Sequence, residues 1–159
     1  MKTNKGFSLI ELIIVIAIIG IMTSIALFAW QRYVNNTNLR TAARDVVSDF
    51  QDCKVKATSE NRDYQISFVN GTNSSYTISA PATDTHAAVS TTKLPTAHDA
   101  GIQITSAAFF GSSAANIITF HARGITSSNG TIIMTNSRAS NATIKTNVTG
   151  KAYVTFTMQ

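Results

Sequence analysis

The sequence predicts an α+β protein, in which one long N-terminal helix packs its second half on a mostly antiparallel β-sheet head. Two observations support this fold class. Residues 12–30 contain no charged side chain, and apolar residues recur at three- and four-residue spacing over residues 39–57, so a continuous helix is expected there. After residue 62, apolar and polar residues alternate between turns rich in Asn, Ser and Gly, which is typical of strands.

The first half of the predicted helix is long enough to cross a membrane. The uncharged run from Leu12 to Trp30 spans ~28 Å at ~1.5 Å per residue, close to the hydrocarbon thickness of a bilayer. It is also longer than the apolar core of an ordinary secretory signal peptide. Lys2 and Lys5 precede it and favour a cytoplasmic N-terminus, which places the rest of the chain outside the cytoplasm.

Glu11 is the one acidic residue set into this apolar start. An ionised carboxylate costs roughly 2.5–3.5 kcal/mol near the centre of a membrane helix and less near its end, so it needs a positively charged partner. Cleavage of the chain after Gly6 would supply one, because the new α-amino group of Phe7 would lie ~6 Å along the helix axis from Glu11. The amine of a neighbouring subunit would serve equally well, and Glu11 would then set the register of assembly.

The segment Lys5–Leu12, which reads Lys-Gly-Phe-Ser-Leu-Ile-Glu-Leu, resembles the class III signal of type IV pilins and pseudopilins. This resemblance implies that a membrane prepilin peptidase cuts after Gly6 and methylates the new N-terminal Phe7. It makes Glu11 the family's glutamate in the first turn of the mature helix. The implied partners are that peptidase, other pilin or pseudopilin subunits, their assembly platform and the inner membrane. Phe28 departs from the pattern, because many major pilins have a helix-breaking proline there.

The motif divides the chain into four predicted segments. They are a prepilin leader, residues 1–6; a transmembrane and assembly helix, residues 7–30; an amphipathic helix half, residues 31–61; and an extracytoplasmic β-rich head, residues 62–159. The full chain has 13 Lys and Arg, so loss of Lys2 and Lys5 leaves 11 against 8 Asp and Glu, a formal charge of +3. This mild charge permits an anionic partner without requiring one.

The amphipathic half presents one apolar stripe, formed by Leu39, Ala42, Ala43, Val46, Val47, Phe50, Cys53 and Ala57. Cys53 is the only cysteine, so the chain has no internal disulfide, and its place on the stripe predicts a buried thiol. Strands are predicted over residues 64–68, 76–78, 101–105, 117–120, 131–135, 143–148 and 152–158. Between them, residues 81–101 are predicted to form a long exposed loop with a short strand around Val89.

The downstream half is similar to the GspH/FimT family, which contains minor pseudopilins of type II secretion and minor pilins. The similarity is carried by Arg44–Arg62, Ile117–Phe120, Gly124, Gly130–Ile132 and Thr149–Lys151. Some FimT-like members bind DNA through a C-terminal Gly-Arg-x-Arg motif. The matching residues here are Gly150-Lys151-Ala152-Tyr153, in which one arginine is replaced by lysine and the other by tyrosine.

A phosphate-binding patch for DNA is predicted from Arg123, Arg138, Lys145 and Lys151, because each phosphate contact adds salt-sensitive affinity that does not depend on sequence. Four scattered cations on strands and turns are more often simply part of a solvated surface. The three histidines, His86, His98 and His121, have no metal-ligand spacing and are expected at the surface. No catalytic motif is present, and neither a metal nor a cofactor is expected.

The expected function is therefore that of a structural subunit of a type IV pilus or a type II secretion pseudopilus, inserted into its filament through the N-terminal helix. A minor subunit of the GspH/FimT kind fits the downstream similarity. The alternative is a DNA-binding minor pilin that takes part in DNA uptake. A membrane-anchored protein that never assembles is the third interpretation.

Overall fold

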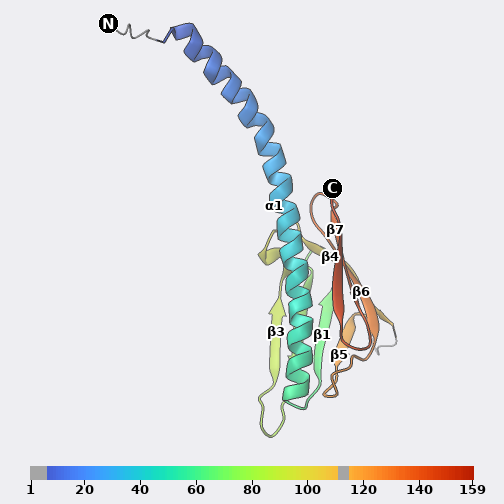
Figure 1. Ribbon diagram of the computed structural model, residues 1–159. Helices are drawn as coiled ribbons and strands as arrows, with labels where there is room; N and C mark the ends of the chain where they lie inside the picture. Colours follow the sequence, from blue (N-terminus) through green and yellow to red (C-terminus); the bar gives the residue numbers. More distant parts are fainter. Residues whose placement is uncertain (1–6, 111–114) are drawn as a thin grey trace. The chain divides into compact units, whose positions relative to one another are not determined.

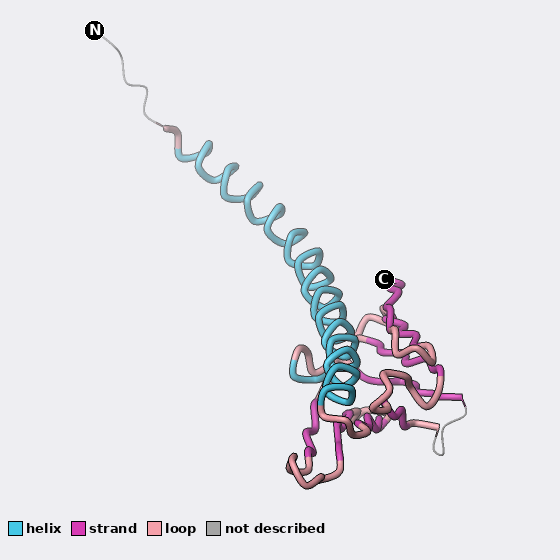
Figure 2. The backbone as a smooth tube through the Cα atoms, turned by 60° about the horizontal axis from the view of Figure 1, so that its bottom comes forward, coloured by secondary structure: helices cyan, strands magenta, loops and turns pink. Residues whose placement is uncertain are grey.

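The computed structural model describes residues 7–110 and 115–159, with the backbone alone at residues 26–28. It contains helix α1 (Leu9–Ser59), the short 3-10 helix η1 (Pro95–Ala97) and eight strands. The strands are β1 (Tyr64–Val69), β2 (Ser75–Ala80), β3 (Val89–Lys93), β4 (Gln103–Phe110), β5 (Ile117–Phe120), β6 (Asn129–Thr135), β7 (Asn141–Thr146) and β8 (Ala152–Thr157). Two compact units result, Met1–Val34 and Asn35–Gln159. Figure 2 shows that the second unit holds all the strands.

Helix α1 runs without interruption for 51 residues, as the absence of proline and the apolar periodicity predicted. It ends in a left-handed C-cap. Asn61 adopts a φ of 49°, which asparagine tolerates, and the Arg62 N–H donates back to the Ala57 carbonyl at 3.2 Å. These contacts satisfy carbonyl groups that the helix leaves without partners and turn the chain into β1.

The second half of α1 forms the centre of the head. Every member of the predicted stripe is buried except Val47, which is partly buried. Phe50 lies at its middle and packs edge-on against Phe68 of β1 and Phe120 of β5, with ring centroids 6.2 Å and 5.5 Å away. Such edge-to-face pairs add to the free energy gained by burying the rings. The predicted amphipathic face is thus confirmed.

The head has two four-stranded antiparallel sheets, with strand orders β3-β2-β1-β5 and β4-β6-β7-β8. The predicted antiparallel character is confirmed, whereas the division into two sheets was not foreseen. In Figure 1, β3 is seen to the left of α1 and β1 to its right, and β7 and β6 lie farther to the right. Alternate residues of both sheets point inward and are fully buried, among them Ile66 and Phe68 in the first sheet and Ile132 and Ile144 in the second.

The short strand predicted around Val89, within the exposed segment over residues 81–101, is confirmed. Val89–Lys93 forms the whole of strand β3, paired with β2, and buried Pro95 begins η1. Strand β3 is an edge strand whose residues are exposed on both faces, apart from the half-buried Val89. Ser and Thr therefore replace the apolar alternation by which a strand is usually recognised. The pairing of β3 with β2 therefore shows only in the tertiary structure.

Gly130 lies in β6 where no larger residue fits. A Cβ atom at this position would lie 2.1 Å from Phe109 Cδ1 and 2.8 Å from the Ala108 carbonyl oxygen. Phe109 is buried and its ring lies 5.7 Å from the ring of Phe68, so it has little room to move. We expect Gly130→Ala to lower the free energy of unfolding by about 1–3 kcal/mol through overpacking.

Thermal or denaturant unfolding of the full-length protein in detergent micelles measures this effect. The neighbouring exposed residue provides the control, and Asn129→Ala should change stability by less than about 0.5 kcal/mol. If both variants unfold like the wild type, Phe109 has room that the structure does not show.

Candidate assembly site

The N-terminal half of α1 is an apolar surface without any protein cover. Large side chains from Leu9 to Ile25 are 44–75% exposed, and α1 is the one described helix that is long and apolar enough to cross a bilayer. Glu11 is the single charged residue of this surface. Its Oε2 accepts a hydrogen bond of 2.8 Å from the Ser8 backbone N–H.

The contact between Ser8 and Glu11 is one half of a capping box. Ser8 directly precedes the first helical residue, and a glutamate three positions on accepts its backbone N–H. The sequence Ser-Leu-Ile-Glu carried this signal, but sequence reasoning assigned Glu11 only to an amine partner. In the uncleaved chain the Glu11 carboxylate therefore already accepts the Ser8 N–H. The amine of Phe7, or that of a neighbouring subunit, must replace this donor or share the carboxylate with it.

Asp49 joins the second half of α1 to the first sheet. It is 6% exposed, and its two carboxylate oxygens accept hydrogen bonds of 2.6 Å each, one from the Tyr76 hydroxyl and one from Lys93 Nζ. Burial, with the adjacent Asp49 carboxylate, raises the pKa of Tyr76 above its ordinary value, so its hydroxyl stays a donor. Each partner comes from a different strand, β2 and β3 respectively. Sequence reasoning missed this contact because its members lie far apart in the chain.

A second polar contact fixes the start of the head helix. The Asn36 side-chain oxygen accepts hydrogen bonds from Ser140 Oγ at 2.8 Å and from Asn136 Nδ2 at 3.1 Å. Asn36 Nδ2 donates to the Gln159 carbonyl at 3.3 Å. Near the other end of α1, Lys54 Nζ donates to the Thr149 carbonyl at 2.7 Å. The helix is thus held to the second sheet at both ends of the head.

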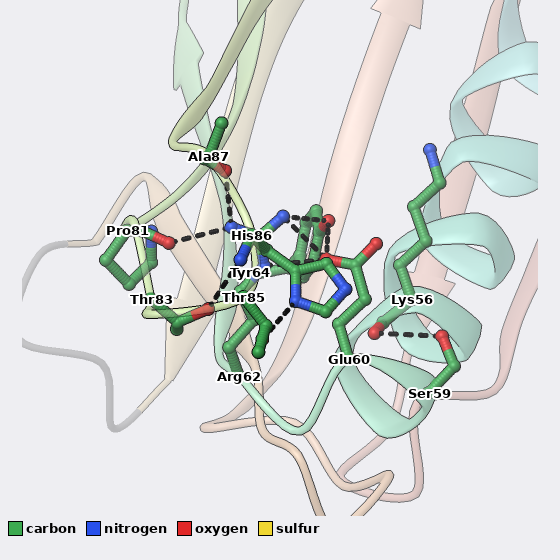
Figure 3. A network of polar contacts seen from close by, with 10 residues as sticks. All are labelled: Lys56, Ser59, Glu60, Arg62, Tyr64, Pro81, Thr83, Thr85, His86 and Ala87. Atoms are coloured by element: carbon green, nitrogen blue, oxygen red, sulfur yellow. Dashed lines mark hydrogen bonds and ion pairs between the residues drawn. The ribbon is translucent and has the colours of Figure 1, made fainter.

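Arg62 holds the connection between β2 and β3, as Figure 3 shows. Its guanidinium donates to the carbonyl oxygens of Pro81 at 2.8 Å and Ala87 at 2.7 Å, which close the base of the exposed turn between them. The same guanidinium donates to Glu60 and to the Tyr64 hydroxyl. A hydrogen bond from Tyr64 and the contact with Arg62 lower the pKa of the Glu60 carboxyl, which is therefore charged at neutral pH. The first half of the predicted loop is therefore exposed, but Arg62 holds its two ends together.

Cys53 is buried in the core, and His98 and His121 each lie beside an aspartate. Burial raises the pKa of the Cys53 thiol to about 12, so the predicted buried thiol is confirmed and is unreactive at neutral pH. His98 Nε2 lies 2.7 Å from Asp45, and His121 Nδ1 lies 2.9 Å from Asp63. In the part of the chain that the structure describes, no group of His, Cys, Asp and Glu has the geometry of a metal site.

The four predicted DNA-binding cations do not form one patch. Arg138 follows Asn136 in the turn between β6 and β7, at the end of the second sheet opposite the turn between β7 and β8. Lys145 is on the outer face, beside its cross-strand partner Tyr153, whereas Lys151 lies in a groove with Lys54 of α1.

The fourth predicted cation, Arg123, lines a depression together with Asp63 and His121. A carboxylate beside it offsets part of its attraction for a phosphate. Three of the four cations therefore lie toward the end of the head where α1 ends, and Arg138 lies at the opposite end of the second sheet.

Residues 1–27 match the family described as the prokaryotic N-terminal methylation motif. A fimbrial protein of Pseudomonas aeruginosa is 38% identical to this chain over 82 residues, which is 45% of this chain and 53% of that protein. A type IV major alpha-pilin of Moraxella bovis is 60% identical over 37 residues, 23% of each chain. The present chain thus spans about half the length of the Pseudomonas relative and less of the Moraxella one.

Two solved structures share the fold. The type IV minor pilin FimU of Pseudomonas aeruginosa has a TM-score of 0.55 at 15% identity, over 77% of this chain and 92% of that one. The minor pseudopilin EpsH of the type 2 secretion system of Vibrio cholerae has a TM-score of 0.56 at 11% identity, over 75% of this chain and 97% of that one. At these identities the likeness is one of fold.

The N-terminal motif and the fimbrial relatives make the chain similar to type IV pilins and pseudopilins, and the fold supports this likeness. The resemblance seen in Lys5–Leu12 is thereby confirmed. The relatives named here are fimbrial proteins, pilins and a pseudopilin, so the expectation of a protein that is not an enzyme is confirmed as well.

The buried contact of Asp49 predicts a measurable contribution of one hydroxyl group. Tyr76→Phe removes a hydrogen bond to a charged acceptor, which typically contributes about 1.5–3 kcal/mol to stability. We expect the free energy of unfolding of the full-length protein to fall by that amount. Tyr153→Phe is the matched control, because Tyr153 is 51% exposed and its loss should fall within about 0.5 kcal/mol. Equal losses in both variants would contradict a specific role for this hydrogen bond.

Proposed function

We propose that this protein is a structural subunit of a type IV pilus or of a type II secretion pseudopilus, and that it enters the filament through the N-terminal half of α1. The observation that carries the proposal is an uncovered apolar helix with one carboxylate in its first turn, Glu11, in a chain whose first 27 residues match the N-terminal methylation motif. Side-by-side packing of such helices would cover this apolar surface and give Glu11 a charged partner.

Processing is the first step of the proposed function. A prepilin peptidase removes residues 1–6 and methylates the amine of Phe7. The subunit waits in the inner membrane as a single-pass protein with its head outside the cytoplasm, and an assembly platform then moves it into a filament of other pilin or pseudopilin subunits. Lys2 and Lys5 support this orientation, because positive charge favours the cytoplasmic side.

Within the superfamily we favour a minor subunit of the GspH/FimT kind. The head, with two four-stranded sheets packed on a helix, has the fold of a minor pilin and of a minor pseudopilin. The downstream similarity in sequence points the same way. DNA capture stays the alternative. It is the weaker one, because Arg138 lies at the other end of the second sheet from the other predicted cations and Tyr153 stands where the family's second arginine is expected.

Cleavage after Gly6 is tested by replacing the residue that the peptidase has to accommodate. Gly6→Glu introduces a bulky charged side chain at the cut, so we expect the variant to keep its leader while the wild type begins at N-methylated Phe7. Intact mass and N-terminal sequencing of membrane-extracted protein measure this. Asn4→Glu is the control, since it adds the same charge to the leader away from the cut. A wild-type chain that still begins at Met1 in cells with active prepilin peptidase would refute processing.

The role of Glu11 is tested by the ratio of filament-associated to membrane-resident protein. Glu11→Val should leave membrane insertion and the head intact, because it removes a charge from lipid. Incorporation into filaments should fall roughly tenfold or more, since the incoming amine would meet no counter-charge. Glu11→Asp should give an intermediate ratio, because it keeps the charge with a shorter reach.

Thr23→Val is the matched control for this experiment. It also removes a polar group from the apolar helix, but its hydroxyl bonds only to the Ile19 carbonyl of the same helix. We expect wild-type incorporation for this variant. Equal ratios for the wild type and both Glu11 variants would show that the carboxylate does not guide assembly.

A further inference from the structure

Strand β8 has an open edge. It ends the order β4-β6-β7-β8, and none of the described strands pairs with its outer side. From Ala152 to Gln159 the sequence contains no charged residue, proline or glycine. Charged side chains, prolines and bulges are the devices by which proteins keep edge strands from pairing with other chains. The edge of β8 has none of them within the strand.

The register shows which backbone groups point to this edge. The Asn147 N–H donates to the Lys151 carbonyl at 3.1 Å, so these two residues form a hydrogen-bonded pair at the start of the β7–β8 hairpin. In an antiparallel ladder, hydrogen-bonded and non-bonded pairs alternate. Counting along the register, Ala152, Val154 and Phe156 are in non-bonded pairs with β7. Their N–H and C=O groups therefore point outward.

The inner side of the same edge is incompletely covered. The side chains of Ala152, Val154 and Phe156 are only half-buried, whereas their partners on β7 are fully buried: Thr146, Ile144 and Ala142. At the start of β8, a groove of about 490 Å³ separates α1 from the β7–β8 turn and is lined by Gln51, Lys54, Val55 and residues 149–152. Val55 of this groove is 65% exposed. A strand added beside β8 would have one end at this groove and would run on past the half-buried side chains of Val154 and Phe156.

Positive charge borders the edge on the helix side. The Arg40 guanidinium carbon lies 5.7 Å from the centre of the Phe156 ring, while Lys54 and Lys151 lie in the groove at the other end of β8. None of the groove residues is acidic. The cations therefore favour an acidic occupant, and the outward N–H and C=O groups favour an extended polypeptide.

The occupant is not another copy of this head. None of the eight described strands carries an aspartate or glutamate, so no strand of a second copy complements these cations. We propose that the free edge of β8 binds an extended acidic segment of a different protein, which pairs with β8 as a fifth strand of its sheet. This interface is separate from the proposed assembly helix, so failure of one leaves the other standing.

The test uses the full-length protein in detergent micelles and a synthetic peptide, acetylated Asp-Val-Thr-Val-Glu-Val-Thr-Asp amide. Amide hydrogen exchange is followed by NMR. We expect the peptide to slow exchange at Ala152, Val154 and Phe156 by roughly tenfold or more, because their N–H groups gain acceptors. The Thr155 N–H already belongs to the β7 ladder and should change least.

Three controls decide the interpretation. A peptide methylated on alternate backbone nitrogens should give no protection, because it cannot complete the ladder. Lys151→Glu should weaken binding by roughly three- to tenfold through charge repulsion. Lys56→Glu makes the same change at an exposed position outside the groove and should bind like the wild type.

Three results would overturn the proposal. One is the absence of protection at millimolar peptide. Another is equal protection by a peptide with lysine in place of its acidic residues. The last is binding of a single-stranded DNA 12-mer at Lys54 and Lys151 without any binding of the acidic peptide, which would assign the groove to nucleic acid instead.

Discussion

The head depends on the burial of one helical stripe between two sheets. Each sheet directs alternate side chains inward, where they form one core with the stripe of α1. Phe50 shows the constraint most directly, because its ring contacts β1 and β5 while the helix around it also closes over the second sheet. A change in the rotation of α1 would therefore uncover both sheets at once.

Polar contacts fix the position of the helix along the sheets, which apolar packing alone does not specify. Asn36, Asp49 and Lys54 each bond to a different part of the head: the C-terminal end of the chain, strands β2 and β3, and the β7–β8 turn. Asp49 has the most demanding environment, since a buried carboxylate is tolerated only with donors for its oxygens. Tyr76 and Lys93 supply them, and the first sheet is thereby joined to the helix.

One helix carries two surfaces of opposite design. Its N-terminal half shows apolar side chains with a single carboxylate, which suits contact with lipid or with similar helices. Its C-terminal half shows exposed charges on one side and a buried stripe on the other. The groove at the start of β8 lies at the border of this second half, where Lys54 and Lys151 line it, and Arg40 lies at the other end of the strand beside Phe156.

The sequence by itself determined the continuous helix, its apolar stripe, the buried Cys53 and most of the strands, because these depend on local periodicity and composition. It also contained the motif around Glu11, which is read within eight consecutive residues. Only the tertiary structure decided that the strands form two sheets and that the strand around Val89 runs to Lys93 and pairs with β2 at the edge of its sheet. The same holds for Asp49 with Tyr76 and Lys93, and for Arg62 with the turn after β2. These contacts join residues separated by 19 to 44 positions in the chain. Strand pairing and buried polar contacts depend on which distant segments meet in the fold, and no local sequence pattern encodes that.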